Sequence, residues 1–129
     1  MPKLWGRDWT RDELDAIGEA DDLDIAALQA GGSLRPYTAI WVVRVGDALY
    51  VRSYRGRSGS WFRDALLRHQ GRIRAGGVER DVTFEEADGA DHQAIDKAYQ
   101  IKFARYGATY VDPMVDPNAA AATLRLIPR

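Results

Sequence analysis

The chain has 129 residues, of which 46% are hydrophobic and 29% are charged, and its net charge is −1. These values are typical of one globular domain with its own core. No run reaches the roughly 18 apolar residues of a membrane span, and the absence of cysteine excludes disulfides and thiolate metal sites. The first residues lack the apolar stretch of a signal peptide, so we expect a single cytoplasmic domain over residues 1–129.

The first third of the chain predicts a helix and then a strand. Thr10 and Glu13 form a capping-box pattern, and a helix over residues 11–20 follows, with Leu14 and Ile17 on its apolar side. Residues 23–28 alternate in hydrophobicity and predict a first strand. Residues 30–36 predict a loop.

Two hairpins dominate the centre of the chain. Residues 37–45 and 48–54 are β-branched and aromatic runs around Gly46–Asp47, and a second pair of runs flanks Gly76–Gly77. Between the hairpins, residues 60–70 predict a helix with Ser60 as N-cap and Gly71 as its end.

The last third predicts a helix over residues 91–107, capped by Asp91 and ended by Gly107. Residues 111–118 predict a loop containing Pro113 and Pro117, and residues 123–127 a final strand. This order predicts an α+β fold with a mainly antiparallel sheet or small barrel over residues 23–127. Consecutive hairpins exclude a Rossmann arrangement, and the glycines match no P-loop.

Charge is unevenly distributed along this chain. Residues 1–30 contain eight acids against three bases, whereas residues 50–80 contain eight arginines against two acids. The planar guanidinium group suits phosphate and carboxylate. The arginine-rich segment is therefore a candidate anion site.

Residues 50–64 concentrate this signal where a strand passes into a helix. Gly56 and Gly59 allow backbone amides to approach a ligand, and the start of the next helix favours an anion. Trp61 offers a flat face to a ring. The candidate ligands for a phosphate are Arg52, Arg55, Arg57, Ser58 and Ser60, with Ser53 beside them and Tyr54 and Trp61 as ring contacts. The competing interpretation is a solvated basic loop with Trp61 in the core.

The two hairpins and the intervening "SWFRDALLRH" resemble the split β-barrels that bind flavins and deazaflavins, nearest the deazaflavin-dependent nitroreductase and quinone-reductase branch. The chain also resembles a small bacterial family of uncharacterised domains thought to share that barrel. The resemblance covers roughly residues 23–90 and continues to the final strand. It implies a split barrel with flanking helices, hydride transfer on a small organic substrate, and a homodimer with the cofactor between subunits.

The resemblance also places the phosphate site at the end of the second barrel strand and the following loop and helix start, which here are residues 52–61. Tyr37 and Trp41 are candidate substrate contacts on the first hairpin strand. The segment before that hairpin has one arginine and no lysine, where deazaflavin reductases carry a segment rich in glycine, lysine and serine. The cofactor is therefore left as FMN, a deazaflavin or none. No catalytic acid or base stands out.

Two other functions remain open. One is a cofactor-free barrel that binds a small molecule or serves as an enzyme of secondary metabolism. The other is a single-stranded nucleic-acid binder, which the isoelectric point near 6.1 disfavours. His69 and His92 are too far apart in sequence to predict a metal site, and residues 85–91 predict a solvated turn. An aromatic series on and after the last helix predicts core packing or a dimer surface, with a pocket wall as the alternative: Tyr99, Phe103, Tyr106 and Tyr110.

Overall fold

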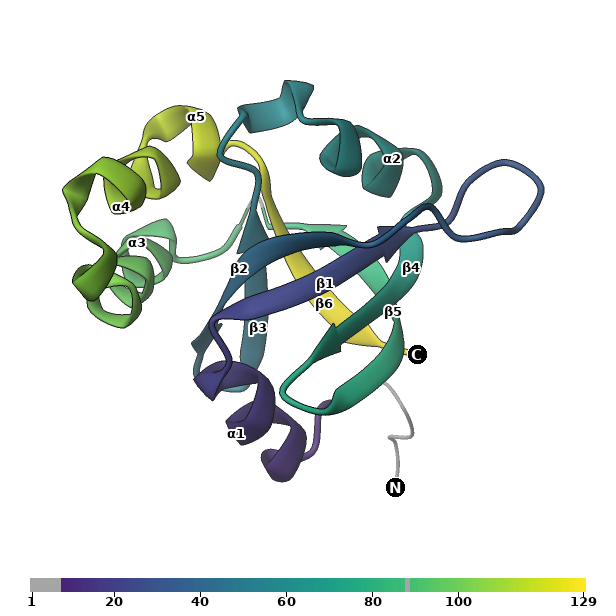
Figure 1. Cartoon of the computed structure of the whole chain (residues 1–129), viewed down its shortest axis with the longest axis horizontal. Helices are drawn as coiled ribbons and strands as arrows, with labels where there is room; N and C mark the ends of the chain where they lie inside the picture. Colours follow the sequence, from purple (N-terminus) through teal and green to yellow (C-terminus); the bar gives the residue numbers. More distant parts are fainter. Residues whose placement is uncertain (1–7, 88) are drawn as a thin grey trace.

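The computed structural model describes residues 8–87 and 89–129. Within them, six strands close into an antiparallel barrel in the order β1-β2-β3-β6-β5-β4 (Figure 1). This confirms the α+β class and the predicted barrel. The strands are β1 (Asp22–Ala27), β2 (Thr38–Val45), β3 (Ala48–Arg52), β4 (Gln70–Ala75), β5 (Val78–Glu86) and β6 (Thr123–Pro128).

Both predicted hairpins are confirmed by the strand register. Val45 pairs with Ala48 across the Gly46–Asp47 turn, and Ala75 pairs with Val78 across Gly76–Gly77. β1 joins β4 to β2, and β6 joins β3 to β5, so these two strands close the sheet. No open edge remains among these strands.

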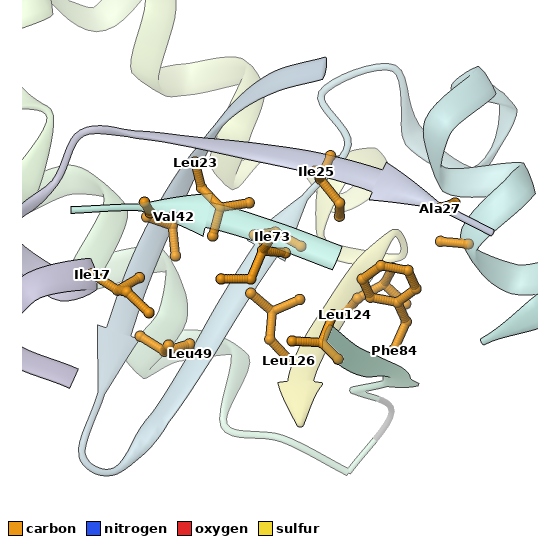
Figure 2. Close-up of a cluster of buried hydrophobic side chains, with 14 of the residues drawn as sticks. Ile17, Leu23, Ile25, Ala27, Val42, Leu49, Ile73, Phe84, Leu124 and Leu126 are labelled. Carbon is orange, nitrogen blue, oxygen red and sulfur yellow. The ribbon is translucent and has the colours of Figure 1, made fainter. Parts of the chain in front are cut away.

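The barrel interior is the main hydrophobic core (Figure 2). Inward-facing side chains alternate with outward-facing ones along each strand, as the period of two requires. Helix α1 (Arg11–Glu19) packs on one end through Ile17, and helix α2 (Ser60–Arg68) covers the other through Phe62 and Ala65. The labelled interior residues include Leu23, Ile25, Val42, Leu49, Ile73, Phe84, Leu124 and Leu126.

The predicted capping box of α1 is present. The Thr10 hydroxyl accepts from the Glu13 N–H at 3.1 Å, and the Glu13 carboxylate accepts from the Thr10 N–H at 2.9 Å. Arg80 on β5 donates to the other Glu13 oxygen at 2.8 Å. Burial alone would raise the pKa of Glu13, but the hydrogen bonds from Thr10 and Arg80 together lower it.

We expect Glu13→Gln to reduce the free energy of unfolding at neutral pH by about 1 kcal/mol, because it removes the charge from these hydrogen bonds. A carboxylate with a lowered pKa contributes stability above its ordinary pKa of 4.5 and loses it as the pH falls through the folded-state value. The difference from wild type should therefore shrink in urea titrations at progressively lower pH. Glu19 is exposed at the far end of α1. Glu19→Gln should therefore show no such loss, and equal behaviour of both variants would contradict the role of Glu13.

The predicted boundaries of two helices differ from the structure. Gly59, not Ser60, is the N-cap of α2, and His69 rather than Gly71 ends this helix, with a left-handed φ of 58°. Gly71 lies in β4 instead. The long helix predicted over 91–107 is α3 (His92–Lys102), followed by the 3-10 turn η2 (Ala104–Tyr106) and Gly107.

The predicted loop over residues 111–118 is wrong. It lies in α4 (Ala108–Val115) and α5 (Pro117–Ala120). Pro117 begins α5, where its missing N–H has no helical acceptor to lose, and Asp116 caps that helix by accepting from the Asn118 N–H at 2.8 Å. α4 forms despite Pro113 because Val111 and Met114 are buried in a second apolar cluster with residues of α3.

Within the described residues no helix is both long and apolar enough to span a membrane.

Candidate functional site

A pocket of about 600 Å³ lies on the outside of the barrel, between the start of β2, the end of β3, the start of α2, and α4. This volume lies within the range of small-molecule sites. No acidic residue is among the described residues that line it. The lining consists of Thr38, Ala39, Ile40, Trp41, Arg52, Ser53, Tyr54, Arg55, Gly59, Ser60, Trp61, Thr109, Tyr110, Pro113 and Met114.

Most of the predicted site residues meet in this pocket. They come from β2, from the end of β3 and the turn after it, and from the first turn of α2: Trp41, Arg52, Ser53, Tyr54, Arg55, Ser60 and Trp61. The strand-to-helix connection brings them together because the 3-10 turn η1 (Gly56–Ser58) folds back between β3 and α2. The segment singled out in the sequence is therefore one wall of a real cavity.

Three predicted residues lie outside the pocket lining. Arg57 turns away and donates to the Glu86 carboxylate at 2.7 Å and to the Ala121 carbonyl at 2.9 Å. Ser58 donates to the Arg55 carbonyl at 3.0 Å within η1. Tyr37 packs beneath the guanidinium of Arg74, whose Cζ is 3.7 Å from the ring centroid. These three residues are therefore left out of the proposed ligand set.

Arg52 lines the pocket, but its side chain is fully buried and bound to internal acceptors. Nε donates to Thr123 Oγ1 at 2.9 Å, and Nη1 donates to Asp96 Oδ1 at 2.5 Å and to the Met114 carbonyl at 2.9 Å. Nη2 lies 3.2 Å from His92 Nδ1. These bonds occupy most of its donors, so we do not retain Arg52 as a phosphate ligand.

Arg55 is the pocket cation that remains available. Its Nε donates to the Tyr54 hydroxyl at 3.1 Å, and its Cζ lies 5.4 Å from the centroid of the Tyr54 ring. Among the described residues it forms no ion pair. Tyr54 is itself 59% exposed, so both side chains lie within reach of a ligand at the pocket mouth.

The start of α2 adds backbone donors to the same wall. Its N-cap, Gly59, provides no side-chain cap, and no acid lies in the first turn. A Cβ at Gly59 would lie 2.4 Å from Ser53 Oγ, so a larger residue there would force the Ser53 side chain to move. The early N–H groups of a helix favour an anion. Ser60 and Trp61 line the pocket, whereas the Gly59 N–H donates to the Gly56 carbonyl at 3.2 Å.

Aromatic side chains form the rest of the surface. Trp41 is stacked on Phe103 at 3.9 Å between ring centroids, which fixes its plane, and Trp61 meets Phe62 edge-on at 5.9 Å. Tyr110 on α4 lines the opposite wall and is 66% exposed. An aromatic cavity with an available cation and no acid suits a planar ligand with a negative group.

The sequence did not predict the α4 wall, because residues 111–118 were expected to form a loop and no element was expected over residues 108–110. Tyr110 was noted within an aromatic series, and the pocket-wall alternative for that residue is the one the structure supports. Tyr99 and Phe103 are buried in the second cluster, as the core interpretation predicted. The Asp116–Pro117 pair was the local signal for helical structure in this segment.

The central arginines are largely neutralised. Of the eight in residues 50–80, five form ion pairs with described acids: Arg52–Asp96, Arg57–Glu86, Arg72–Asp81, Arg74–Asp24 and Arg80–Glu13. Two of these acids come from the acidic first thirty residues, so the uneven charge is partly cancelled in the fold. This arrangement breaks up a continuous basic track for nucleic acid. No cluster of three metal-ligating side chains occurs among the described residues.

A closed six-stranded barrel with an external aromatic pocket defines the general class of this protein, that of the split-barrel domains. More specifically, the chain belongs to the DUF2255 family, described as an uncharacterized protein conserved in bacteria, whose model matches residues 13–126. A search of curated proteins gives no match.

Solved structures share the fold at low sequence identity. HutZ, a heme storage protein from Vibrio cholerae, superposes with a TM-score of 0.61 at 13% identity, over 89% of this chain and 86% of that one. A conserved hypothetical protein from Mycobacterium tuberculosis gives 0.60 at 13% identity, over 98% and 84%. A FAD and heme binding protein from Mycobacterium smegmatis gives 0.51 at 23% identity, over 92% of this chain and 65% of that one. The resemblance to cofactor-binding split barrels is thus confirmed for the fold.

Proposed function

We propose that this protein binds a flavin-type cofactor, FMN or a deazaflavin, in the external pocket and acts as an oxidoreductase on a small organic substrate. The observation that carries the proposal is the pocket itself, which has aromatic walls, one available arginine and a helix start without an acidic side chain. Proteins of similar fold named as binding FAD or heme add support. We further propose a cytoplasmic homodimer, in which a second copy covers the exposed Tyr54 and Tyr110 at the pocket rim.

The residues fit such a ligand in distinct roles. Arg55, the Ser60 hydroxyl and the early amides of α2 would hold the phosphate. Trp61 and Tyr54 would contact the ring, while Trp41 and the α4 wall would face the substrate. A bound flavin supplies the hydride chemistry itself, so the chain's own task is to grip the phosphate, orient the ring and exclude water.

Titration of the purified protein with FMN and with a deazaflavin tests this assignment. Trp41 and Trp61 line the pocket, so quenching of tryptophan fluorescence reports binding there. We expect a dissociation constant below about 1 mM, which corresponds to about −4 kcal/mol. If neither compound binds below that value, the redox assignment fails.

The second candidate is a cofactor-free barrel that binds a small aromatic anion in the same pocket. It is favoured because only one of the described cations that line the pocket is available to a ligand: Arg52 is bound internally, and Arg57 and Arg74 are ion-paired outside the pocket. Binding of simple aromatic carboxylates without binding of either flavin would support this candidate.

Arg55→Ala should weaken FMN binding about tenfold, because it removes one charge-assisted hydrogen bond of about 1.5 kcal/mol. Its melting temperature should remain that of wild type, since Arg55 forms no ion pair with the described residues. Arg63→Ala is the matched control, because Arg63 lies on α2 outside the pocket lining. Equal FMN affinities of the two variants would show that Arg55 does not bind the ligand.

A further inference from the structure

The guanidinium of Arg52 links the barrel to the helices that complete the pocket. It lies at the end of β3, and its bonds reach Thr123 on β6, Asp96 and His92 on α3, and the main chain of Met114 on α4. Its Cζ also lies 5.5 Å from the ring centroid of Tyr99. A fully buried charge is tolerated only where such partners surround it.

Helix α4 accepts one of the hydrogen bonds of Arg52. It lies beside the barrel together with α3 and α5 (Figure 1), and it packs mainly on α3, α5 and η2. Val111 and Met114 anchor its apolar side, and Gly107, with a φ of 89°, precedes it. The hydrogen bond from Arg52 to the Met114 carbonyl is a polar link from a barrel strand to the helix that forms the far pocket wall.

His92 can support this geometry in only one protonation state. A guanidinium has donors and no acceptor, so His92 Nδ1, 3.2 Å from Arg52 Nη2, must present its lone pair. Nε2 then carries the proton and donates to the Ala87 carbonyl at 2.9 Å. A proton added at Nδ1 would point an N–H at the guanidinium N–H and place two cations in contact.

The charged groups that the described residues place on the elements around this contact do not remove the conflict. On α3 they are Asp91, which caps the helix by accepting from the Ala94 N–H at 3.1 Å, and Asp96, which binds Arg52. From β3 the charge is Arg52 itself, and from the end of β5 it is Glu86, which pairs with Arg57. α4 contributes only the Met114 carbonyl to the hydrogen bonds of Arg52.

We propose that His92 is a proton-sensitive latch for the pocket: neutral His92 keeps Arg52 aligned on the Met114 carbonyl, and protonation of His92 turns the guanidinium away and loosens α4. Arg52 is thus a positioning residue, and the affinity of the pocket for its ligand falls when His92 takes up a proton. The effect on affinity rests on the proposed function, whereas the release of α4 does not require a ligand.

Hydrogen exchange in the ligand-free protein tests the latch. Protection factors of the α4 amides, corrected for intrinsic exchange, are compared at about pH 7.5 and about pH 5.5, within the interval over which a histidine side chain can change its charge. In wild type we expect α4 protection to fall at least about fivefold at the lower pH, the lower end of coupling between linked sites. The α1 amides serve as the internal reference.

Two variants make the test specific. His92→Gln keeps an acceptor for Arg52 and a donor for Ala87 but cannot take up a proton, so its α4 protection should change less than about twofold. His69→Gln, which alters the other histidine of the chain, should behave like wild type. No change in wild type, an equal change in His92→Gln, or an equal loss of protection in α1 would each overturn the latch.

Ligand binding separates this proposal from the proposed function. If FMN binds, its dissociation constant should rise more between about pH 7.5 and about pH 5.5 in wild type than in His92→Gln; equal ratios would overturn the link between latch and pocket. Titration of the FMN phosphate itself is common to both proteins and cancels in this comparison. If FMN does not bind while α4 protection depends on His92, the latch stands and the flavin assignment fails.

Discussion

Replacing Gly71 with alanine should lower the free energy of unfolding by about 3 kcal/mol, the upper end of the usual cost of overpacking. Gly71 pairs with Ala27 of β1 on one side and with Val82 of β5 on the other. A Cβ there would lie 2.3 Å from the Ala26 carbonyl oxygen and 2.8 Å from Phe84 Cζ. The carbonyl is held by the sheet and the ring by the core, so neither can withdraw cheaply. Urea denaturation followed by circular dichroism measures the loss.

Gly89→Ala is the control for the loss of glycine itself. Nothing lies within 4 Å of a Cβ at that position, so its stability should change by less than about 1 kcal/mol. Similar unfolding midpoints for the Gly71 and Gly89 variants would show that the close approach around Gly71 relaxes without cost.

Gly71 also shows which structural features local sequence patterns predict and which they do not. From sequence it marks the end of a helix, because a glycine after an amphipathic run is a common terminator. In the fold His69 takes the left-handed position, and Gly71 is needed because β1 and the Phe84 ring crowd it. Both two-residue hairpin turns were predicted correctly, since each is encoded by adjacent residues. The strand pairings that close the barrel join distant segments, and only the family resemblance indicated them.

In the candidate site, too, the features formed by adjacent residues were predicted, and those formed by distant residues were not. Arg55, Ser60 and Trp61 were predicted because they follow one another in a single strand-to-helix connection. The fate of Arg52 was not predictable from its neighbours, because its partners Asp96 and Met114 lie 44 and 62 residues away. An arginine in an alternating strand is expected to face solvent, but here α3 and α4 cover that face.

Asp96→Ala should lower the free energy of unfolding by about 3 kcal/mol, because it leaves the guanidinium of Arg52 buried without its counter-ion. We take the lower end of the range for broken buried pairs, since the Asp96 side chain keeps 33% of its surface exposed whereas that of Arg52 is fully buried. Asp81→Ala removes the partner of Arg72 at a more exposed site, with both side chains at least 41% exposed. That variant should lose no more than about 1 kcal/mol.

The Arg52→Met/Asp96→Ala double variant separates the cost of an orphaned charge from the loss of the ion pair. If the buried charge is the main penalty, the double variant should lose less stability than the two single variants added together, because no unpaired guanidinium remains. Additive losses would mean that solvent reaches Arg52 once Asp96 is gone. Arg52 also donates to the Met114 carbonyl of the pocket wall. The double variant should therefore lose ligand affinity even where its stability is regained, because the buried guanidinium helps to set the shape of the pocket.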